Sequence, residues 1–489
     1  MLNQQELEKY LWGAATALRG TIDAGDYKQY IFPLLFFKRI SDVYDEEYSN
    51  ALAESDGDID YAAFAENHHF QVPAGAHWSD VRETTVNIGQ ALQNAMRAIE
   101  QANPDTLHGI FGDASWTNKE RLSDEMLTNL IEHYSQHKLN LSNVPDDKLG
   151  NAYEYLIKEF ADDSGHTAAE FYTNRTVVKL MTMIMNPQPG ESVYDPACGS
   201  GGLLLNCALH LKDEGKEYRT LKLYGQEINL LTSAIARMNM FMHGIEEFDI
   251  VRGDTLANPG LLENDELKKF NIILANPPYS IKSWDRKTFD SDPYGRNIWG
   301  TPPQGCADYA FQQHIQKSLD VNNGRSISLW PHGILFRDSE SDMRRKMIEQ
   351  DLVECVIGLG PNLFYNSPME ACLLITKNNK EASKKGKILF INAVKEVKQQ
   401  SNMGYLEQVH IDKIFTAYKE FASQESFSAL VDIEDVLAKS ANMAINLYIR
   451  SDSLSDNDSI SFFSAYEQRQ QSSGRFKASM EKLFRELAQ

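Results

Sequence analysis

Two short segments, each placed directly after an apolar run, constrain this chain more than any other feature of its sequence. The first is the glycine-rich segment 193–202 (VYDPACGSGG), and the second is the segment 276–279 (NPPY). The apolar runs 192–194 and 272–275 that lead into them have the length and composition of buried strands. Because ligands of open α/β sheets bind beyond the carboxyl ends of the strands, we expect both segments to line one pocket.

The first segment predicts a tight turn between a strand and a helix. Asp195 ends the strand. The turn that follows holds Gly199, Gly201 and Gly202, and glycine adopts positive φ and lets the backbone approach a ligand. An apolar helix begins at residues 203–208, so the turn would present free N–H groups at a helix amino terminus. The segment has neither the G-x-G-x-x-G spacing of dinucleotide-binding folds nor the Lys-Ser/Thr pair of a P-loop.

Two further carboxylates follow apolar segments later in the chain. Glu227 ends the segment 223–227, and Asp254 ends the segment 249–254. A carboxylate at the next strand tip can accept hydrogen bonds from both ribose hydroxyls of a nucleotide-like ligand, and Asp254 could accept one from an adenine amino group. Either acid alone would fit a solvated strand end. Together with Asp195, they predict a cofactor that contains a nucleoside.

The second segment has the composition of a rigid loop that is rich in acceptors. Pro277 and Pro278 fix φ and remove two N–H donors. The Asn276 side-chain oxygen and the Pro277 carbonyl can then accept both hydrogens of one amino group. An amine conjugated to an aromatic ring is a poor nucleophile, and two acceptors would stabilise the positive charge that grows on it during attack on an electrophile. Tyr279 supplies a flat face on which an aromatic ring could stack, whereas a plain turn after a buried strand is the structural alternative.

Together these segments resemble the motifs of S-adenosylmethionine (SAM) dependent DNA methyltransferases that modify amino groups. The resemblance implies an α/β fold with a mostly parallel, Rossmann-like sheet and an antiparallel edge strand, and it implies SAM as the cofactor. The implied catalytic residues are Asn276, Pro277, Pro278 and Tyr279. The implied cofactor-binding residues are Glu170, Phe171, Tyr172, Thr173, Asn174, Arg175, Asp195, Pro196, Gly199, Ser200, Gly201, Gly202, Glu227, Asp254 and Thr255.

Two roles that the resemblance implies, those of Thr173 and Phe364, have alternatives. Thr173 would also be a reasonable N-cap for the apolar helix that follows it, and the family usually has proline where this chain has Asn174. Phe364 resembles the aromatic residue that stacks on the far face of a flipped base, opposite Tyr279, with Tyr365 as the alternative. Phe364 could instead belong to the core, where apolar aromatic side chains are often buried.

The amino-terminal part of the chain narrows the resemblance. Residues 11–20 and 30–42 resemble the helical amino-terminal domain of the methylation subunit of type I restriction–modification systems, and residues around 446–448 resemble its carboxyl region, which contacts a specificity subunit. Residues 388–392 are expected to close the sheet. The expected division is a helical amino-terminal domain over 1–147, a catalytic domain over 148–400 and a helical carboxyl-terminal region over 401–489.

The resemblance also implies an activity and partners. The activity is methyl transfer from SAM to the N6 amine of an adenine that is flipped out of duplex DNA. The partners are duplex DNA, a specificity subunit that reads the DNA sequence, a restriction subunit with endonuclease and translocase activities, and a second copy of this chain. Alternatives are the same chemistry on RNA guanine or protein glutamine, or a catalytically silent assembly scaffold. The intact Asn276 and turn glycines argue against the scaffold.

The charge of the chain is distributed unevenly. The net charge is −21, and residues 1–150 contain 11 Lys and Arg against 24 Asp and Glu. Residues 276–346 contain 10 Lys and Arg against 8 Asp and Glu, so this region is the best suited to contact phosphates. Within it, the long polar loop 281–305 suits either a strand of DNA or an ordinary solvated surface. Its basic and aromatic residues include Trp284, Arg286, Lys287, Arg296 and Trp299.

The remaining sequence features bear on compartment and metal content. The five cysteines have no C-x-x-C spacing, which predicts free thiols in a reducing cytoplasm. Cys198 lies inside the glycine turn and is expected to be a small packing residue. No run of apolar residues approaches the ~20 needed to span a bilayer, and the first residues do not have the pattern of a signal peptide. We expect a cytoplasmic protein without a metal cluster.

Overall fold

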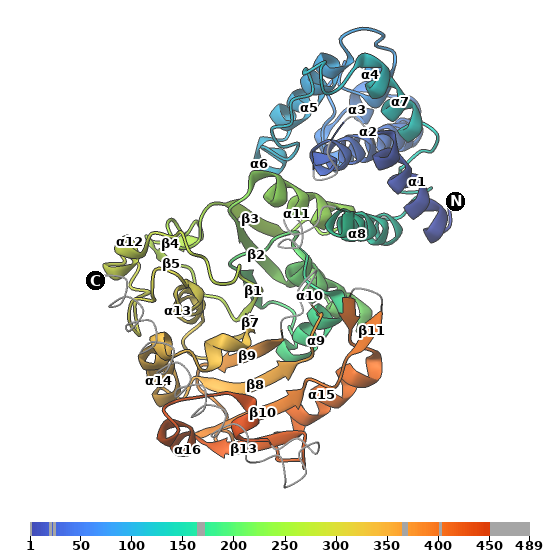
Figure 1. The fold of residues 1–489 in the computed structure, drawn as a ribbon. Helices are drawn as coiled ribbons and strands as arrows, with labels where there is room; N and C mark the ends of the chain where they lie inside the picture. The colour runs from blue at the N-terminus through green and yellow to red at the C-terminus, as the bar shows by residue number, and fades with distance from the viewer. Residues whose placement is uncertain are drawn as a thin grey trace, which may run out of the picture.

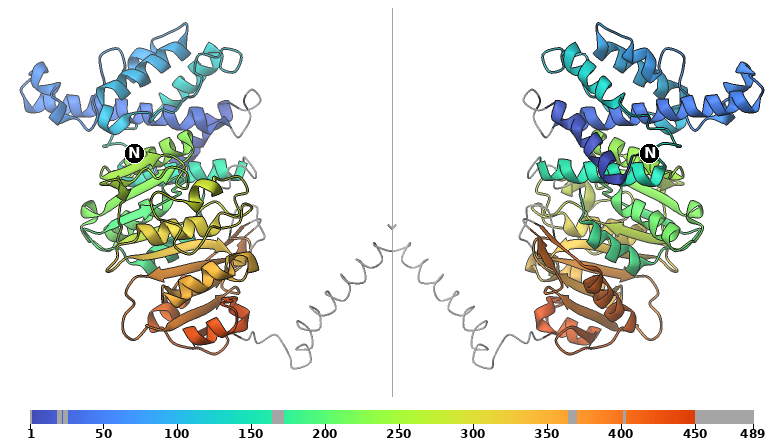
Figure 2. Two further views of the ribbon diagram at one scale, coloured as in Figure 1. Left: turned by 90° about the vertical axis from the view of Figure 1, so that its left-hand side faces the viewer. Right: turned by 90° about the vertical axis from the view of Figure 1, so that its right-hand side faces the viewer.

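The structure is a computed structural model. It describes residues 2–18, 22, 26–163, 172–363, 370–400 and 403–449. Helices of the amino-terminal part lie at one end of a large α/β domain, beyond one edge of its sheet (Figures 1 and 2). Several predicted features lie outside the described residues: Glu170, Phe171, Phe364, Tyr365 and the segment 450–489.

The amino-terminal part is helical, as predicted. Its helices are α1 (Gln4–Ala17), α2 (Lys28–Glu54), α3 (Ile59–Ala62), α4 (Trp78–Arg82), α5 (Ile88–Ala102), α6 (Pro104–Leu107), α7 (Asp124–Tyr134) and α8 (Asp146–Asp163). The apolar block 30–37 lies in α2 and is buried over its whole length. Because this stretch of α2 is apolar and buried on all of its faces, the helix forms the centre of the amino-terminal core.

The main sheet has nine strands in the order β13-β10-β8-β9-β7-β6-β1-β2-β3. The strands are β1 (Ser192–Asp195), β2 (Lys222–Glu227), β3 (Phe248–Arg252), β6 (Ile272–Ala275), β7 (Arg325–Pro331), β8 (Val353–Leu359), β9 (Ala371–Lys377), β10 (Lys387–Ala393) and β13 (Ser428–Asp432). All neighbouring pairs from β3 to β7 are parallel. The predicted mostly parallel α/β sheet is therefore confirmed.

Two strands of the main sheet are antiparallel to their neighbours. β9 lies inside the sheet between β7 and β8, and β13 lies at the edge beside β10. The expectation that residues 388–392 close the sheet is wrong, because β13 pairs along β10 with Ile388 opposite Val431. The sheet thus extends past residue 400 into the region that was expected to be helical. Two short hairpins complete the strands: β4 (Leu262–Glu263) with β5 (Glu266–Leu267), and β11 (Lys398–Gln400) with β12 (Met403–Tyr405).

Helices cover both faces of the sheet and bury a separate core on each. Side chains of successive strand residues point to opposite faces, so Ile272 and Leu274 enter one core while Ile273 and Ala275 enter the other. The first core includes α9 (Arg175–Met185), α10 (Gly202–Asp213) and α15 (Gln408–Glu420). The second includes α13 (Asp308–Ser318), α14 (Ser341–Glu349) and α16 (Ile433–Ala438). The short helix α12 (Arg286–Asp290) lies in the loop after β6.

The amino-terminal helices are joined to the sheet domain through a continuous apolar core. Helix α11 (Leu230–Met242) follows β2 and contributes Met238 and Met242 to the core of the amino-terminal part. On the amino-terminal side, Phe36 stacks on Phe241 with 5.9 Å between the ring centroids. The two parts therefore share buried surface, and part of the stability of each depends on the other.

Phe36→Ala is expected to lower the free energy of unfolding by about 3–5 kcal/mol, because it leaves a cavity between Phe111 and Phe241. Denaturant unfolding followed by circular dichroism measures this change. Phe64→Ala is the control: the Phe64 side chain is 53% exposed, so its loss should change the free energy by less than about 0.5 kcal/mol. Equal destabilisation by the two variants would contradict this packing.

Candidate active site

The glycine turn connects β1 to α10, and side chains would be unfavourable at three of its positions. Gly199 and Gly201 have positive φ, at 54° and 78°. Gly202 begins α10, and a Cβ atom built there would lie only 1.8 Å from Nη1 of Arg175. Glycine is favoured at Gly199 and Gly201 by backbone conformation, and at Gly202 it leaves room for the Arg175 guanidinium, which a side chain would displace.

Asp195, at the end of β1, is a buried carboxylate with unused capacity to accept hydrogen bonds. It is 1% exposed, and its Oδ1 accepts a hydrogen bond from the backbone N–H of Ala197 at 3.0 Å. Its Oδ2 has no hydrogen-bond partner among the described residues. Burial, helped by the nearby charge of Glu227, raises the pKa of Asp195 to about 8. A ligand that brings a donor or a positive charge would satisfy this oxygen.

Glu227 ends the neighbouring strand β2 and contacts the same turn. Its Oε2 accepts a hydrogen bond from the N–H of Gly199 at 3.1 Å, and its Oε1 accepts one from the N–H of Asn229 at 2.9 Å. Burial raises the pKa of this carboxyl group as well. Glu227 therefore fixes the turn, and each of its oxygens keeps a second lone pair for a ligand.

Asp254 and Thr255 follow β3 and differ in their surroundings. Asp254 is exposed, and its Oδ1 accepts hydrogen bonds from the N–H groups of Leu256 and Ala257, which makes a turn. Thr255 is buried, and its hydroxyl donates to the carbonyl of Pro196 at 2.5 Å. Thr255 thus ties the end of β3 to the turn after β1, which is a structural contact.

The segment before α9 reaches the loop of residues 276–279 that follows β6 (the reaction loop). Thr173 Oγ1 accepts a hydrogen bond from Nδ2 of Asn276 at 3.0 Å. The N-cap of α9 is Asn174, whose Oδ1 accepts from the N–H of Thr176, so the alternative role of Thr173 as the cap is wrong. Asn174 Nδ2 also donates to the carbonyl of Gly404 at 2.8 Å. An amide side chain makes both contacts, and proline could make neither.

Arg175 is the first residue of α9. Its side chain lies against the glycine turn and connects α9 to α8. Its guanidinium forms an ion pair with Glu154 of α8, with 2.6 Å between Nη2 and Oε1, and lies 4.9 Å from the centre of the Tyr172 ring. Asn239 of α11 donates to the same Glu154 oxygen and to the carbonyl of Ser200. Sequence reasoning missed Glu154 and Asn239. The available signal for Asn239 was an amide side chain among the methionines at the end of the mostly apolar helix 230–242, whereas nothing local distinguished Glu154.

The structure brings the glycine turn and the reaction loop to one cavity. Asn276 follows β6, which lies beside β1, and its amide is held on both sides. Its Nδ2 donates to Thr173, and its Oδ1 accepts from the Tyr279 hydroxyl at 2.6 Å. The residues that line the cavity are Thr173, Arg175, Asp195, Ala197, Cys198, Gly199, Ser200, Gly202, Leu203 and Asn276. Glu227 contacts its wall through Gly199, while Asp254 and Thr255 do not line it.

Two residues of the loop 281–305 are not placed to meet DNA. Arg296 and Trp299 are each 1% exposed. Arg296 forms an ion pair with Asp292 at 2.6 Å and donates to the carbonyl of Thr255, and the Trp299 indole donates to Oε1 of Gln350. Their suggested contact with DNA is therefore wrong, because these side chains hold the loop against the domain. Trp284 and Arg286 are partly exposed and Lys287 is exposed.

Comparison with known protein families accounts for nearly the whole chain. The N-6 DNA Methylase family matches residues 144–457, and the HsdM N-terminal domain family matches residues 7–134. The chain belongs to the N-6 DNA methylases of type I restriction–modification systems. This methylase is thus an enzyme that methylates adenine N6 in DNA as part of a type I restriction–modification complex. The predicted family, fold class and activity are confirmed, and the family implies SAM as the methyl donor.

Individual relatives agree with this assignment. The type I restriction enzyme MjaVIII methylase subunit of Methanocaldococcus jannaschii is 30% identical, covering 91% of this chain and 78% of its own. The MpnII methylase subunit of Mycoplasma pneumoniae is 27% identical, covering 91% and 89%. A solved type I methyltransferase subunit from Streptococcus thermophilus is 28% identical with a TM-score of 0.79, covering 92% of this chain and 100% of that one. In the part of this methylase that the structure describes, no helix could cross a membrane.

The buried carboxylate of Asp195 predicts a dependence of stability on pH. Because its pKa is raised from 3.8 to about 8, the folded methylase binds this proton more tightly than the unfolded chain does. Its contribution to stability is thus full at low pH and is lost as the pH rises toward 8. In the absence of ligand, the unfolding midpoint of Asp195→Asn should exceed that of the parent by more at pH 8 than at pH 5, because only the parent loses this contribution as the pH rises. Unfolding midpoints at both pH values test this, with exposed Asp60→Asn as the control; a gap that does not change with pH would contradict it.

Proposed function

We propose that SAM binds in the cavity between the glycine turn and the reaction loop. The unpartnered Oδ2 of Asp195 and the absence of a Cβ atom at Gly199 fit a cofactor that carries positive charge and lies close to the backbone. Glu227 is positioned at the end of β2 to accept from the ribose hydroxyls. We assign the adenine amino group of SAM to Asp254, and the methionine end to residues 170–175, of which 170 and 171 lie outside the described part.

The position of Asn276 at this cavity carries the proposed mechanism. Bound SAM supplies a methyl group that is activated by the positive charge on sulfur. Asn276 Oδ1 has two lone pairs; the Tyr279 hydroxyl uses one and the other can accept a hydrogen of the adenine amine. The Pro277 carbonyl accepts the second hydrogen. Because Thr173 holds Nδ2, the oxygen of Asn276 is the atom presented to the amine, and charge that develops on nitrogen is stabilised without reorganisation.

The adenine must leave the DNA stack to reach this loop. The ring of Tyr279 then supports one face of the base, and Phe364, outside the described residues, supports the other. Pro278 is exposed and keeps the loop rigid at the mouth of the site. This arrangement keeps the base in contact with the loop during transfer and excludes water from the amine.

We further propose that other chains supply most of the affinity for DNA. The net charge of −21 is unfavourable for binding duplex DNA, and the excess of positive charge over residues 276–346 is small. A specificity subunit would read the sequence, contacted by residues from 401 onward. A restriction subunit and a second copy of the methylase would complete the complex. All five cysteines lie in the described part of the chain and have free, buried thiols. Free thiols suit the cytoplasm, where cysteines are kept reduced.

Asn276→Ala should reduce the methylation rate by at least about 10²–10³-fold, because it removes an acceptor for the adenine amine. SAM binding should remain, since the glycine turn is unchanged. Transfer of labelled methyl groups to DNA by the assembled complex and calorimetry with SAM measure the two effects. Asn94→Ala on the exposed face of α5 is the matched control. Wild-type rates in Asn276→Ala would remove the mechanism.

Glu227→Ala should weaken SAM binding by about 10- to 100-fold, because a charged acceptor of ribose hydroxyls contributes about 1.5–3 kcal/mol. Glu227→Gln keeps an acceptor of the same length and should lose less. Isothermal calorimetry on the full chain gives both dissociation constants. If Glu227→Ala bound SAM with unchanged affinity, the assignment of Glu227 to the ribose would be refuted.

A further inference from the structure

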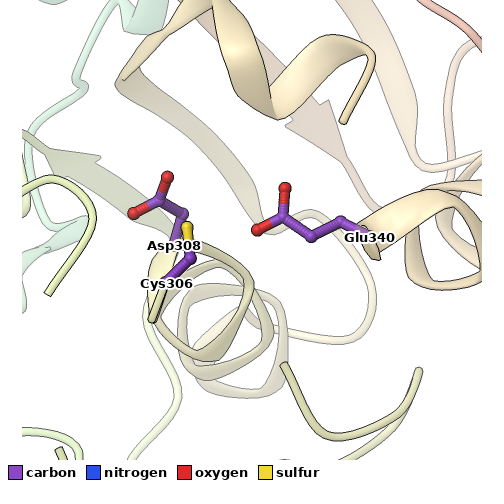
Figure 3. Close-up of side chains that lie close together, drawn as sticks. All are labelled: Cys306, Asp308 and Glu340. Atoms are coloured by element: carbon purple, nitrogen blue, oxygen red, sulfur yellow. The ribbon is translucent and has the colours of Figure 1, made fainter. Parts of the chain in front are cut away.

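A second buried polar cluster lies directly behind the reaction loop. It contains Cys306, Asp308 and Glu340, whose potential ligand atoms all lie within 4.8 Å of one another. Figure 3 shows the Glu340 carboxylate directed from its own segment toward Cys306 and Asp308. All three residues are buried, and both carboxylates are 0% exposed. Buried carboxylates are costly unless they are paired, so the cluster calls for an explanation.

Arg337 provides the positive charge that these carboxylates need. Its Nη2 forms an ion pair with Oδ2 of Asp308, and its Nε donates to Oε2 of Glu340 at 2.8 Å. Carboxylates and a thiol could also ligate a metal ion. However, a guanidinium already lies against both carboxylates and would repel a cation there. The cluster is therefore better explained by the group that it holds than by a metal.

Asp308, one member of the cluster, holds the end of the reaction loop. The backbone N–H of Ser280, the residue after Tyr279, donates to Oδ1 of Asp308 at 2.7 Å. Ser280 has φ of 50°, a left-handed conformation that is unfavourable for a residue with a side chain and persists where its surroundings enforce it. A charged acceptor makes a stronger hydrogen bond than a neutral one. Asp308 thus stabilises the backbone conformation in which the loop ends.

Arg337 holds Asp308 in the orientation that this contact requires. Asp308 begins α13, while Arg337 follows β7, the strand next to β6. The guanidinium binds Asp308 through one oxygen and leaves the other to accept from Ser280. The carbonyl of Arg337 accepts in turn from Arg344 of α14 at 3.1 Å. The loop end is therefore fastened to two helices and a neighbouring strand.

We propose that Asp308 is a positioning residue for methyl transfer. Oriented by Arg337, it holds Ser280 and thereby fixes Asn276 and Tyr279 relative to the cofactor cavity. The proposal rests on the role assigned above to Asn276. Asp308 itself does not line that cavity, so its loss should affect the rate of transfer rather than the binding of SAM.

The test compares Asp308→Leu and Asp308→Asn in the full chain assembled with its partner subunits. Asp308→Leu removes the acceptor and should reduce kcat by about 10²-fold, the size of effect expected when a reacting group is misplaced by about 1 Å. The dissociation constant for SAM should stay within about twofold. Asp308→Asn keeps an oxygen for Ser280 and should recover at least about tenfold of the lost rate, which keeps the test valid if the leucine variant folds poorly.

Asp351 offers a control at the amino ends of the parallel strands, between α14 and β8, and so away from the reaction loop. Like Ser280, it has positive φ, at 56°, and its side chain, which is 30% exposed, pairs with buried Lys380 at 2.6 Å and accepts from the N–H of Gly386 at 3.0 Å. Asp351→Leu should therefore lower the thermal midpoint as Asp308→Leu does while kcat stays within about twofold of wild type.

Three outcomes would overturn the proposal. The first is a wild-type kcat in Asp308→Leu, and the second is an equal fall of kcat in Asp351→Leu at a matched loss of stability. The third is a stoichiometric metal ion, found by elemental analysis of the purified complex, that is lost in Asp308→Asn. Failure of the proposed function would look different, since Asn276→Ala would then keep its activity.

Discussion

The hydrogen bond between the Asn276 amide and Thr173 joins segments that lie 103 residues apart, and the site depends on it. The neighbouring strands β1 and β6, with Val193 opposite Ile272, bring the glycine turn and the reaction loop to the same ends of the strands, and the bond to Thr173 adds the segment before α9 to them. Parallel pairing alone brings the loops near each other. The amide contacts to Thr173 and Tyr279 then define which atom of Asn276 faces a substrate.

The electrostatics of the cavity complement this geometry. Asp195 and Glu227 are both buried, and burial raises the pKa of each. Two carboxylates in one poorly solvated wall are unfavourable without a cation nearby. A positively charged cofactor would relieve that cost, so the same residues that weaken the empty fold would strengthen ligand binding. Stability and affinity are thus opposed at Asp195, as is common at functional sites.

Local sequence patterns were sufficient to predict the strands around the site and the turn glycines, because each of these features depends on residues that are adjacent in the chain. Other features depend on partners far along the chain. Strand β13 was missed because its pairing with β10 is visible only in the folded sheet. Arg296 was taken for a surface cation because its acceptors include a carbonyl 41 residues away. Asp308 gave no local signal at all, since its contact with Ser280 spans 28 residues.

Helix α8 begins at Asp146, so an expected boundary at residue 147 would cut its first turn. Asp146 pairs with Arg39 of the amino-terminal helices at 2.7 Å, and two turns later Glu154 holds Arg175 under the glycine turn. One rigid helix therefore belongs to both parts. Evolution could exchange neither part for that of a distant relative without rebuilding this helix, and the two are expected to be inherited as a single unit.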